Sequence, residues 1–216
     1  MRSMSTVLFA TILLSSPAIA ETELSFYGGA HAARLGRVIG NDPGGVGRFD
    51  FLASWDSQSS TPARYHGVRL TRWQRDDWGW ALDFSHGNIN ADAATLSGNG
   101  LSLLGFSDGM NVLTVNRYRQ WRDLVGPVTP YLGAGLGVTI PHVEFDSGAG
   151  KTSEYQFGGP AVSLVAGAKY PMNSRWSVFG EYKGTYSVNN VELMSGGNLG
   201  ANLVTNSINL GASFGF

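Results

Sequence analysis

The chain has 216 residues, of which 43% are hydrophobic and 14% charged, with 30 Gly, no Cys and a formal net charge of -1. This length predicts one domain. The near-neutral charge gives no electrostatic footprint for nucleic acid. The hydrophobic fraction argues against a disordered polymer. An ordinary soluble protein would carry roughly 25% charged residues, so the low charge here argues against a soluble enzyme surface. Because the chain has no Cys, no disulfide can stabilise the fold. Its stability must instead come from a large core, a closed sheet or a membrane.

The first 20 residues have the pattern of a secretory signal peptide. Arg2 precedes an apolar run, Val7 to Leu14, and Ala18-Ile19-Ala20 supplies the small-residue cleavage motif before Glu21. We therefore predict a signal peptide at 1–20 and a single exported domain at 21–216. After residue 20 the sequence contains no run of about 18 apolar residues, so no transmembrane helix is predicted.

The remaining sequence alternates with a period of two. Near the C-terminus Ile208, Leu210, Ala212, Phe214 and Phe216 share one parity, and small or polar residues share the other. Such alternation is typical of a strand with one apolar face. Strands are predicted in this way at residues 23–34, 63–74, 78–88, 109–121, 129–141, 160–170, 175–188 and 203–216.

The connections between these eight strands alternate in length. Short turns follow the second, fourth and sixth strands, whereas the polar stretches 35–62, 89–108, 142–159 and 189–202 are long. Short turns at one end and long loops at the other indicate an eight-stranded, antiparallel, up-and-down transmembrane β-barrel of the bacterial outer membrane. Trp78, Trp80, Tyr170 and Trp176 lie beside the short turns, where an interfacial aromatic girdle is expected. A soluble barrel or sandwich, with its apolar faces packed inward, is the alternative.

The second and third strands also predict a register. If Arg75 to Asp77 form the turn, the numbers of opposed residues sum to 152. Arg69 then faces Asp83 inside the barrel, and Trp73 lies over Gly79; such pairs pin a register. The same arithmetic places His66 opposite His86 and pairs Val68 with Phe84 and Leu70 with Leu82 on the outside.

All four histidines, His31, His66, His86 and His142, lie near the long-loop ends of their strands. By parity His66, His86 and His142 face outward, and Glu144 continues the outward face after His142. These side chains are either amphipathic residues at the water interface or a site that binds a divalent ion or moves protons. His66 and His86 could share a metal across one strand spacing, whereas His142 could join them only through loop folding.

Charged residues of the opposite parity predict a luminal network of Arg69, Asp83, Lys169, Glu181 and Lys183. We expect this network to be structural, because unpaired charges in a narrow lumen cost several kcal/mol. An eight-stranded barrel is filled by side chains, which excludes a general diffusion pore. The sequence contains no nucleotide-binding loop, and no His has a Ser two residues away on the same strand face, so a local Ser-His dyad is unsupported.

Several segments resemble the outer-membrane lipid A oxidases of alphaproteobacteria, over nearly the whole exported chain. They are Glu23 to Gly29, Ala81 to His86, Phe106 to Asn111, Tyr131 to Gly137, Pro141 to Glu144, Glu154 to Ala161 and Trp176 to Tyr186. The resemblance implies oxidation of the proximal glucosamine of lipid A to 2-aminogluconate, with O2 as electron acceptor and H2O2 as product. Composition and spacing do not imply this reaction.

The resemblance implies roles for particular residues. We expect His86, His142, Glu144 and Glu154, which lie on the resembling segments, to be catalytic. We also expect His66 and Trp80, which lie outside those segments, to bind the substrate, lipid A of the outer leaflet. Ground-state O2 reacts poorly with closed-shell sugars, so a divalent or redox metal is expected, held by His86, His142 and Glu144. Two other functions stay open: a non-enzymatic surface barrel, such as an adhesin or structural antigen, and a lipid A acyl-hydrolase.

Overall fold

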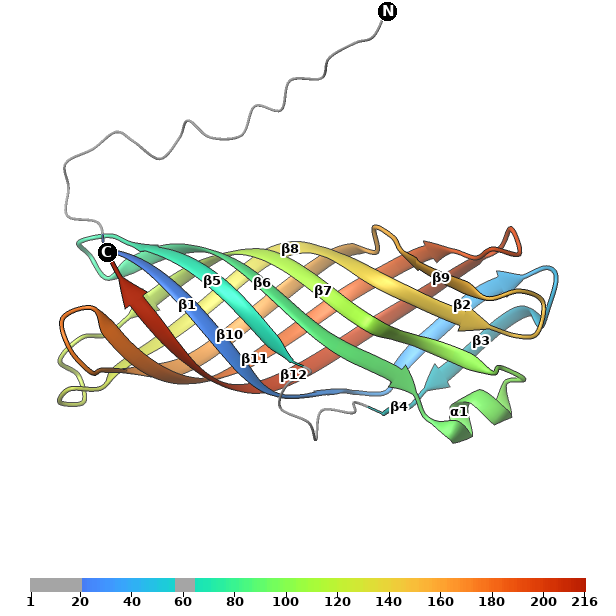
Figure 1. Ribbon diagram of the computed structural model, residues 1–216, viewed down its shortest axis with the longest axis horizontal. Helices are drawn as coiled ribbons and strands as arrows, with labels where there is room; N and C mark the ends of the chain where they lie inside the picture. Colours follow the sequence, from blue (N-terminus) through green and yellow to red (C-terminus); the bar gives the residue numbers. More distant parts are fainter. Residues whose placement is uncertain (1–20, 57–64) are drawn as a thin grey trace, which may run out of the picture.

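Strand pairing closes the chain into a ring. The computed structural model describes residues 21–56 and 65–216, so the predicted signal peptide lies outside the described residues. Eight antiparallel strands pair in the order β1–β5–β6–β7–β8–β10–β11–β12, and β12 pairs with β1 (Figure 1). They are β1 Thr22–Ala33, β5 His66–Trp73, β6 Trp78–Ala91, β7 Leu103–Gln120, β8 Thr129–Asp146, β10 Gly159–Pro171, β11 Trp176–Glu192 and β12 Asn198–Gly215. The predicted eight-stranded, up-and-down transmembrane barrel is confirmed.

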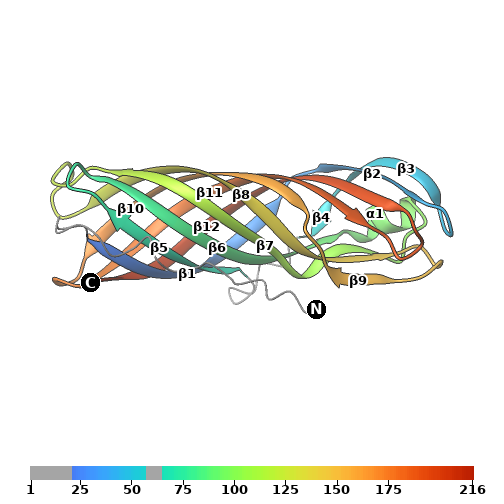
Figure 2. The same ribbon diagram turned by 90° about the horizontal axis from the view of Figure 1, so that it is seen from above.

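The two ends of the barrel differ as the loop lengths predict. The C-terminus and the short connections β5–β6, β7–β8 and β10–β11 lie at one end, which we call the turn end (Figure 1). The connections β2–β3, β8–β9 and β11–β12 and the segment around α1 lie at the opposite end, the loop end, and both views show the strands strongly tilted between the two (Figure 2). The described residues contain no helix of the length and apolarity that a membrane crossing requires.

The register predicted for β5 and β6 is confirmed. Arg69 pairs with Asp83, Trp73 with Gly79 and His66 with His86. A Cβ atom on Gly79 would lie 2.7 Å from the Trp73 ring, so the tryptophan lies flat over the glycine. Four more luminal aromatic rings cover glycines on neighbouring strands, in the pairs Tyr27–Gly67, Tyr118–Gly133, Tyr131–Gly167 and Phe179–Gly211. The inward glycines therefore make room for aromatic side chains.

The polarity of the wall reverses along each long strand. On β6 the outward residues Leu82 and Phe84 are apolar and exposed, whereas beyond His86 the outward positions are Asn88 and Asn90. The inward positions change in the opposite sense, from Asp83 to the buried Ile89. We call the outward apolar zone, from the turn end to His86, the apolar belt. Its upper limit marks where lipid gives way to water around the wall, because an exposed apolar band is stable only in lipid.

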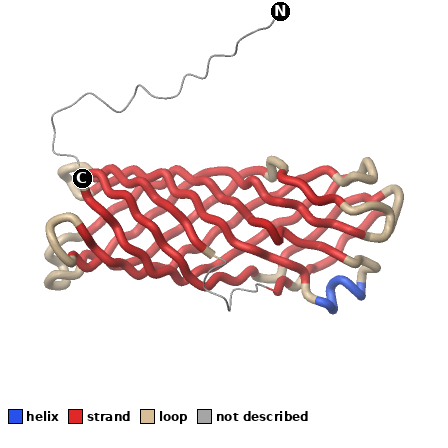
Figure 3. The backbone as a smooth tube through the Cα atoms, viewed as in Figure 1, coloured by secondary structure: helices blue, strands red, loops and turns tan. Residues whose placement is uncertain are grey.

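The prediction of long polar loops is wrong in one respect, because much of the length of these stretches forms β-sheet. Four strands lie in these stretches: β2 Gly36–Asp42, β3 Gly47–Ala53, β4 Trp55–Asp56 and β9 Thr152–Tyr155. They pair with β12, β2, β6 and β8 respectively, and extend the wall beyond the belt. Figure 3 shows the helix α1, Ala93–Gly98, at this end. Asp92 caps α1, and the hydrogen bond from the Thr95 N–H lowers the pKa of the Asp92 carboxyl.

An apolar core fills this extension. Its buried members include Val38, Trp55, Ile89, Leu104, Phe106, Val143, Phe145, Val191, Leu199 and Leu203. Water surrounds the wall here, so apolar side chains turn inward as they do in a soluble barrel. The polar composition of these stretches predicted loops. The strands in fact continue through them, with apolar residues on the inward face and polar residues on the outward face.

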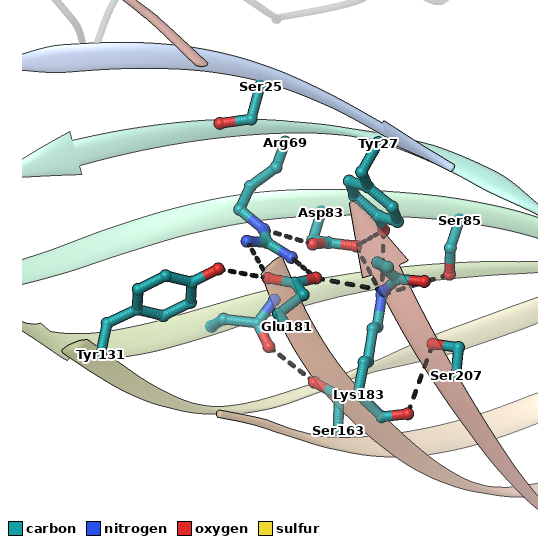
Figure 4. A network of polar contacts seen from close by, with 12 residues as sticks. Ser25, Tyr27, Arg69, Asp83, Ser85, Tyr131, Ser163, Glu181, Lys183 and Ser207 are labelled. Carbon is teal, nitrogen blue, oxygen red and sulfur yellow. Dashed lines mark hydrogen bonds and ion pairs between the residues drawn. The ribbon is translucent and has the colours of Figure 1, made fainter. Parts of the chain in front are cut away.

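The predicted luminal network is present inside the belt (Figure 4). Arg69 Nε donates to Asp83 at 2.6 Å, and both Arg69 Nη atoms donate to Glu181 at 2.8 and 2.7 Å. Lys183 Nζ donates to the other Asp83 oxygen at 2.6 Å. The four charges are at most 5% exposed, and Tyr27 and Tyr131 donate hydroxyl protons to the two carboxylates.

Lys169, also assigned to this network, belongs to a separate pair. It contacts Glu23 at 2.5 Å, and Glu23 also accepts a hydrogen bond from Trp73 Nε1. The cavity between the two groups measures about 20 Å³, room for about one water molecule. The lumen is therefore closed to solutes at this level.

The position of the belt predicts a contrast between two substitutions on β12. Leu210→Arg places a charge in the apolar belt, where Leu210 is 73% exposed, and should lower the free energy of unfolding from vesicles by about 2–4 kcal/mol. Asn202→Arg, outward on the same strand but beyond the belt, should change it little. Urea titration of vesicle-folded protein measures both values. Equal costs would contradict the assigned belt.

The network predicts a second contrast. Arg69→Met leaves Asp83 and Glu181 with uncompensated charge in the lumen, and should lower the free energy of unfolding by about 3–5 kcal/mol. Arg37→Met removes an equally short pair with Asp50, but both side chains are solvent-exposed, so its effect should be far smaller. Unfolding in urea followed by tryptophan fluorescence compares them. Similar losses in the two variants would show that the buried network does not stabilise the lumen.

Candidate functional site

Six side chains form a polar rim just at the upper limit of the apolar belt. These residues, which we call the outer rim, are His66, His86, Asp108, Asn111, His142 and Tyr155. They come from β5, β6, β7, β8 and β9, which are neighbours in the sheet. The outward placement predicted for His66, His86 and His142 agrees with this geometry.

His66 and His86 form the first part of the outer rim. Their ring centroids lie 5.0 Å apart, and His86 Nδ1 lies 2.8 Å from Asn111 Oδ1. The Asn111 amide nitrogen donates to the Ile140 carbonyl, so its oxygen accepts from His86 Nδ1–H. In the neutral imidazole the lone pair is then on Nε2. His86 is consequently oriented to act as a base through Nε2.

An irregularity in β7 brings the next strands into contact with His86. The register of β7 shifts between Gly105 and Met110 against both of its neighbours. Gly109 adopts φ 129°, and a side chain on it would collide with the His86 ring. This bulge carries Asp108 to a position where its Oδ2 lies 3.9 Å from His142 Nδ1. A segment of β7 therefore lies between His86 and His142, because Asn111 contacts the first and Asp108 lies near the second.

Tyr155 covers His142 on its other side. The two rings meet edge to face at 4.8 Å, and the Tyr155 hydroxyl donates to the Asp108 carbonyl at 2.8 Å. His142 is only 9% exposed as a result. Its Nδ1 makes no hydrogen bond within the described ranges 21–56 and 65–216.

The other predicted catalytic residues stand apart from this cluster. Glu144 forms a salt bridge with Lys151 at 3.1 Å and lies opposite Gly105, beyond the bulge. Glu154 lies opposite Val143 and accepts a hydrogen bond from the Gln156 amide. Both acids are on β8 or β9 near His142, where Glu144 contacts Lys151 and Glu154 contacts Gln156.

Trp80, expected beside His66 as a substrate contact, is separated from it along the wall. It lies near the turn end, where the Arg117 guanidinium stacks 4.9 Å from its ring centre. Its predicted position beside a short turn is confirmed. Its assignment to the same site as His66 does not fit the structure, because the two residues lie at opposite limits of the belt.

The predicted metal site also does not fit. Within the part of the chain that the structure describes, no group of three or more His, Cys, Asp or Glu side chains could hold a metal ion. His86 bonds Asn111, and the Glu144 carboxylate contacts Lys151, so His86, His142 and Glu144 do not form a ligand set. The outer rim is suited to proton transfer and hydrogen bonding.

Sequence reasoning missed three members of the outer rim: Asp108, Asn111 and Tyr155. The Asp108-Gly109 dipeptide, at the boundary between the predicted loop 89–108 and the predicted strand 109–121, was the available signal for an irregular backbone. Tyr155 could not be found by parity, because the pairing of β9 with β8 exists only in the folded chain.

The cover over His142 predicts its chemical reactivity. Tyr155→Ala should increase the rate at which diethyl pyrocarbonate modifies His142, because removal of the ring exposes the imidazole. His66, exposed in the unmodified protein, should react quickly in both proteins. Peptide mass mapping over time measures each rate, and Tyr170→Ala at the turn end serves as the control. An unchanged His142 rate in Tyr155→Ala would contradict the cover.

Comparisons with known proteins support the fold alone. The chain is similar to the outer membrane protein AlkL, determined in lipid bilayers, with a TM-score of 0.51 and 15% identity over 100% of this chain and 97% of that one. It is also similar to Neisserial surface protein A (0.49, 12%, 91% and 97%) and to the N-terminal β-barrel domain of Pseudomonas aeruginosa OprF (0.47, 15%, 91% and 97%). No protein-family model and no curated protein sequence matches the chain.

Proposed function

We propose that this protein acts in the bacterial outer membrane on lipid A, oxidising its proximal glucosamine to 2-aminogluconate. The observation that supports a lipid substrate is the position of the outer rim. Ionisable side chains of five neighbouring strands face outward where the apolar belt ends. In an outer-membrane barrel the loop end is extracellular, so this height corresponds to the head groups of the outer leaflet.

The filled lumen supports a site on the wall. Arg69, Asp83, Glu181 and Lys183 occupy the barrel axis, and the adjoining cavity holds about one water molecule. Asp83 and Glu181, which lie on segments resembling the oxidases, are fully engaged in this network. A sugar attached to acyl chains reaches the outer rim from the lipid without leaving the membrane.

In the proposed reaction His86 Nε2 accepts the proton of the anomeric hydroxyl. The C1–H bond breaks as the C1–O bond gains double-bond character, and the two electrons and two protons reduce O2 to H2O2. The resulting lactone takes up water and opens to 2-aminogluconate. The reaction type rests on the sequence resemblance, and the described residues offer no ligand set for the redox metal that it implies.

A second candidate is a non-enzymatic surface barrel, such as an adhesin or structural antigen. The apolar core beyond the belt favours it, because this core packs β2, β3, β4 and α1 together into an ordered platform above the membrane. The similarity to outer-membrane barrels is equally compatible with this function. Acyl hydrolysis gains no support, since no hydrogen bond joins a Ser to His66, His86 or His142 among the described residues.

Mass spectrometry of lipid A from cells with and without the gene tests these functions. The oxidase should add the mass of one oxygen atom to the proximal sugar. His86→Ala should reduce this product by about 10²-fold or more, the typical contribution of a general base. Asn202→Ala, outward on β12 and away from the outer rim, is the matched control.

Each alternative gives a different spectrum. Unchanged lipid A from cells that contain the folded protein would overturn the oxidase and favour the surface barrel. Loss of an acyl chain would instead identify a hydrolase. Heat-dependent migration in detergent gels checks that every variant is folded.

A further inference from the structure

Two arginines on the lipid-facing wall near the turn end have no role in the function proposed above. Arg117 pairs with Trp80, and Arg119 with Trp78, so all four side chains lie on the outward face. The Arg117 guanidinium is 4.9 Å from the centres of both tryptophan rings, and that of Arg119 is 5.5 Å from Trp78. Tryptophan prefers the membrane–water interface, which assigns this cluster to head-group depth.

These two guanidiniums have no acidic partner among the described residues. Arg117 donates to the Gln74 side-chain oxygen at 3.0 Å, and Arg119 donates to the Asp76 backbone carbonyl. The nearby Arg122, by contrast, forms salt bridges with Glu21 and Asp77. A guanidinium stays protonated at any physiological pH. The wall therefore presents two positive charges that the protein itself does not neutralise.

An apolar groove of about 740 Å³ adjoins Arg119 on the same outward face. Arg119, Leu132, Ala166 and Tyr182 face one another in turn across β7, β8, β10 and β11. The small Ala166 lies between bulkier neighbours and leaves the groove open. Its volume falls within the range of about 300–1,000 Å³ found for ligand sites.

We propose that this wall binds one anionic phospholipid of the periplasmic leaflet, with its phosphate at Arg117 and Arg119 and an acyl chain in the groove. Guanidinium groups pair with phosphate through two parallel charge-assisted hydrogen bonds. The groove is lined almost wholly by apolar side chains, which suits a hydrocarbon chain. The site lies at the turn end, so the ligand comes from the leaflet opposite to that of the outer rim.

Charge argues against a second copy of the chain as the occupant. A two-fold dimer through this face would place the same surface against itself, and would bring four unneutralised guanidiniums together. Like charges opposed in this way cost several kcal/mol. An anionic lipid neutralises them instead.

Native mass spectrometry of the folded barrel in detergent, with equal amounts of phosphatidylglycerol and phosphatidylethanolamine, tests the proposal. We expect one phosphatidylglycerol to be retained, with an affinity about tenfold above that of phosphatidylethanolamine, equivalent to about 1.4 kcal/mol. Arg117→Gln/Arg119→Gln should abolish this preference. Arg37→Gln/Arg48→Gln, which removes the same charge from β2 and β3 at the loop end, should keep it.

A second pair of measurements tests the groove. Ala134→Phe/Ala166→Phe keeps both arginines but fills the groove, and should abolish retention of the lipid. Glycerophosphoglycerol, the same head group without chains, should fail to displace bound phosphatidylglycerol from the unmodified protein, which keeps the test valid if the double variant does not fold. Equal retention of both lipids, a preference that survives in Arg117→Gln/Arg119→Gln, or a lipid-free dimer would overturn the proposal. Full displacement by the chain-free head group would overturn the role of the groove.

Discussion

Inside lipid, a backbone N–H or C=O without a partner costs several kcal/mol, and this constraint governs the whole structure. A sheet meets it only by closing, and the pairing of β1 with β12 removes the last edges of the ring. Once the wall is closed, period-two alternation sends each residue either to lipid or to the lumen. The aromatic residues that cover luminal glycines and the outward leucines of the belt are two results of the same closure.

Closure also decides where chemistry can take place. An eight-stranded ring has a narrow axis, and here Arg69 bridges Asp83 and Glu181 across it while Lys183 neutralises Asp83 again. These charges are paired and hydrogen-bonded, so they satisfy the lumen and leave no passage through it. Ligands therefore meet the protein on its outer wall or on the extension beyond the belt.

The outer wall has a different chemistry at each limit of the belt. At the loop end, imidazoles, an amide and a carboxylate gather around the β7 bulge. At the turn end, arginines stack on tryptophans beside an apolar groove. Imidazoles suit proton transfer, and permanent cations suit a phosphate. The two proposals thus concern opposite leaflets, and each can fail without the other.

Much of this could be predicted from the sequence, because the side-chain period of a strand is a local property. Alternation identified the eight strands and the outward parity of His66, His86 and His142, and one short turn was enough to set the pairing of Arg69 with Asp83. The luminal network followed from parity as well, except that Lys169 pairs with Glu23. The predicted register pairs Trp80 with Arg72 and His86 with His66, so the separation of Trp80 from His66 could already be predicted from the sequence, and assigning both residues to one site conflicted with that register.

Tertiary structure alone decided the contacts between segments that have no fixed spacing along the sequence. The bulge at Asp108 and Gly109 joins His86 to His142, and the pairing of β9 with β8 brings Tyr155 over His142. The sequence predicted loops where the extension is ordered, because the polarity of its strands is inverted. Water surrounds the wall there, so the apolar side chains face inward and the polar ones outward. Only the position of the membrane along the barrel reveals this reversal. Sequence by itself therefore determined the eight strands of the ring, the register of one strand pair and the two faces of the wall, whereas the assembly of a site from five strands required the closed wall that sets their relative heights.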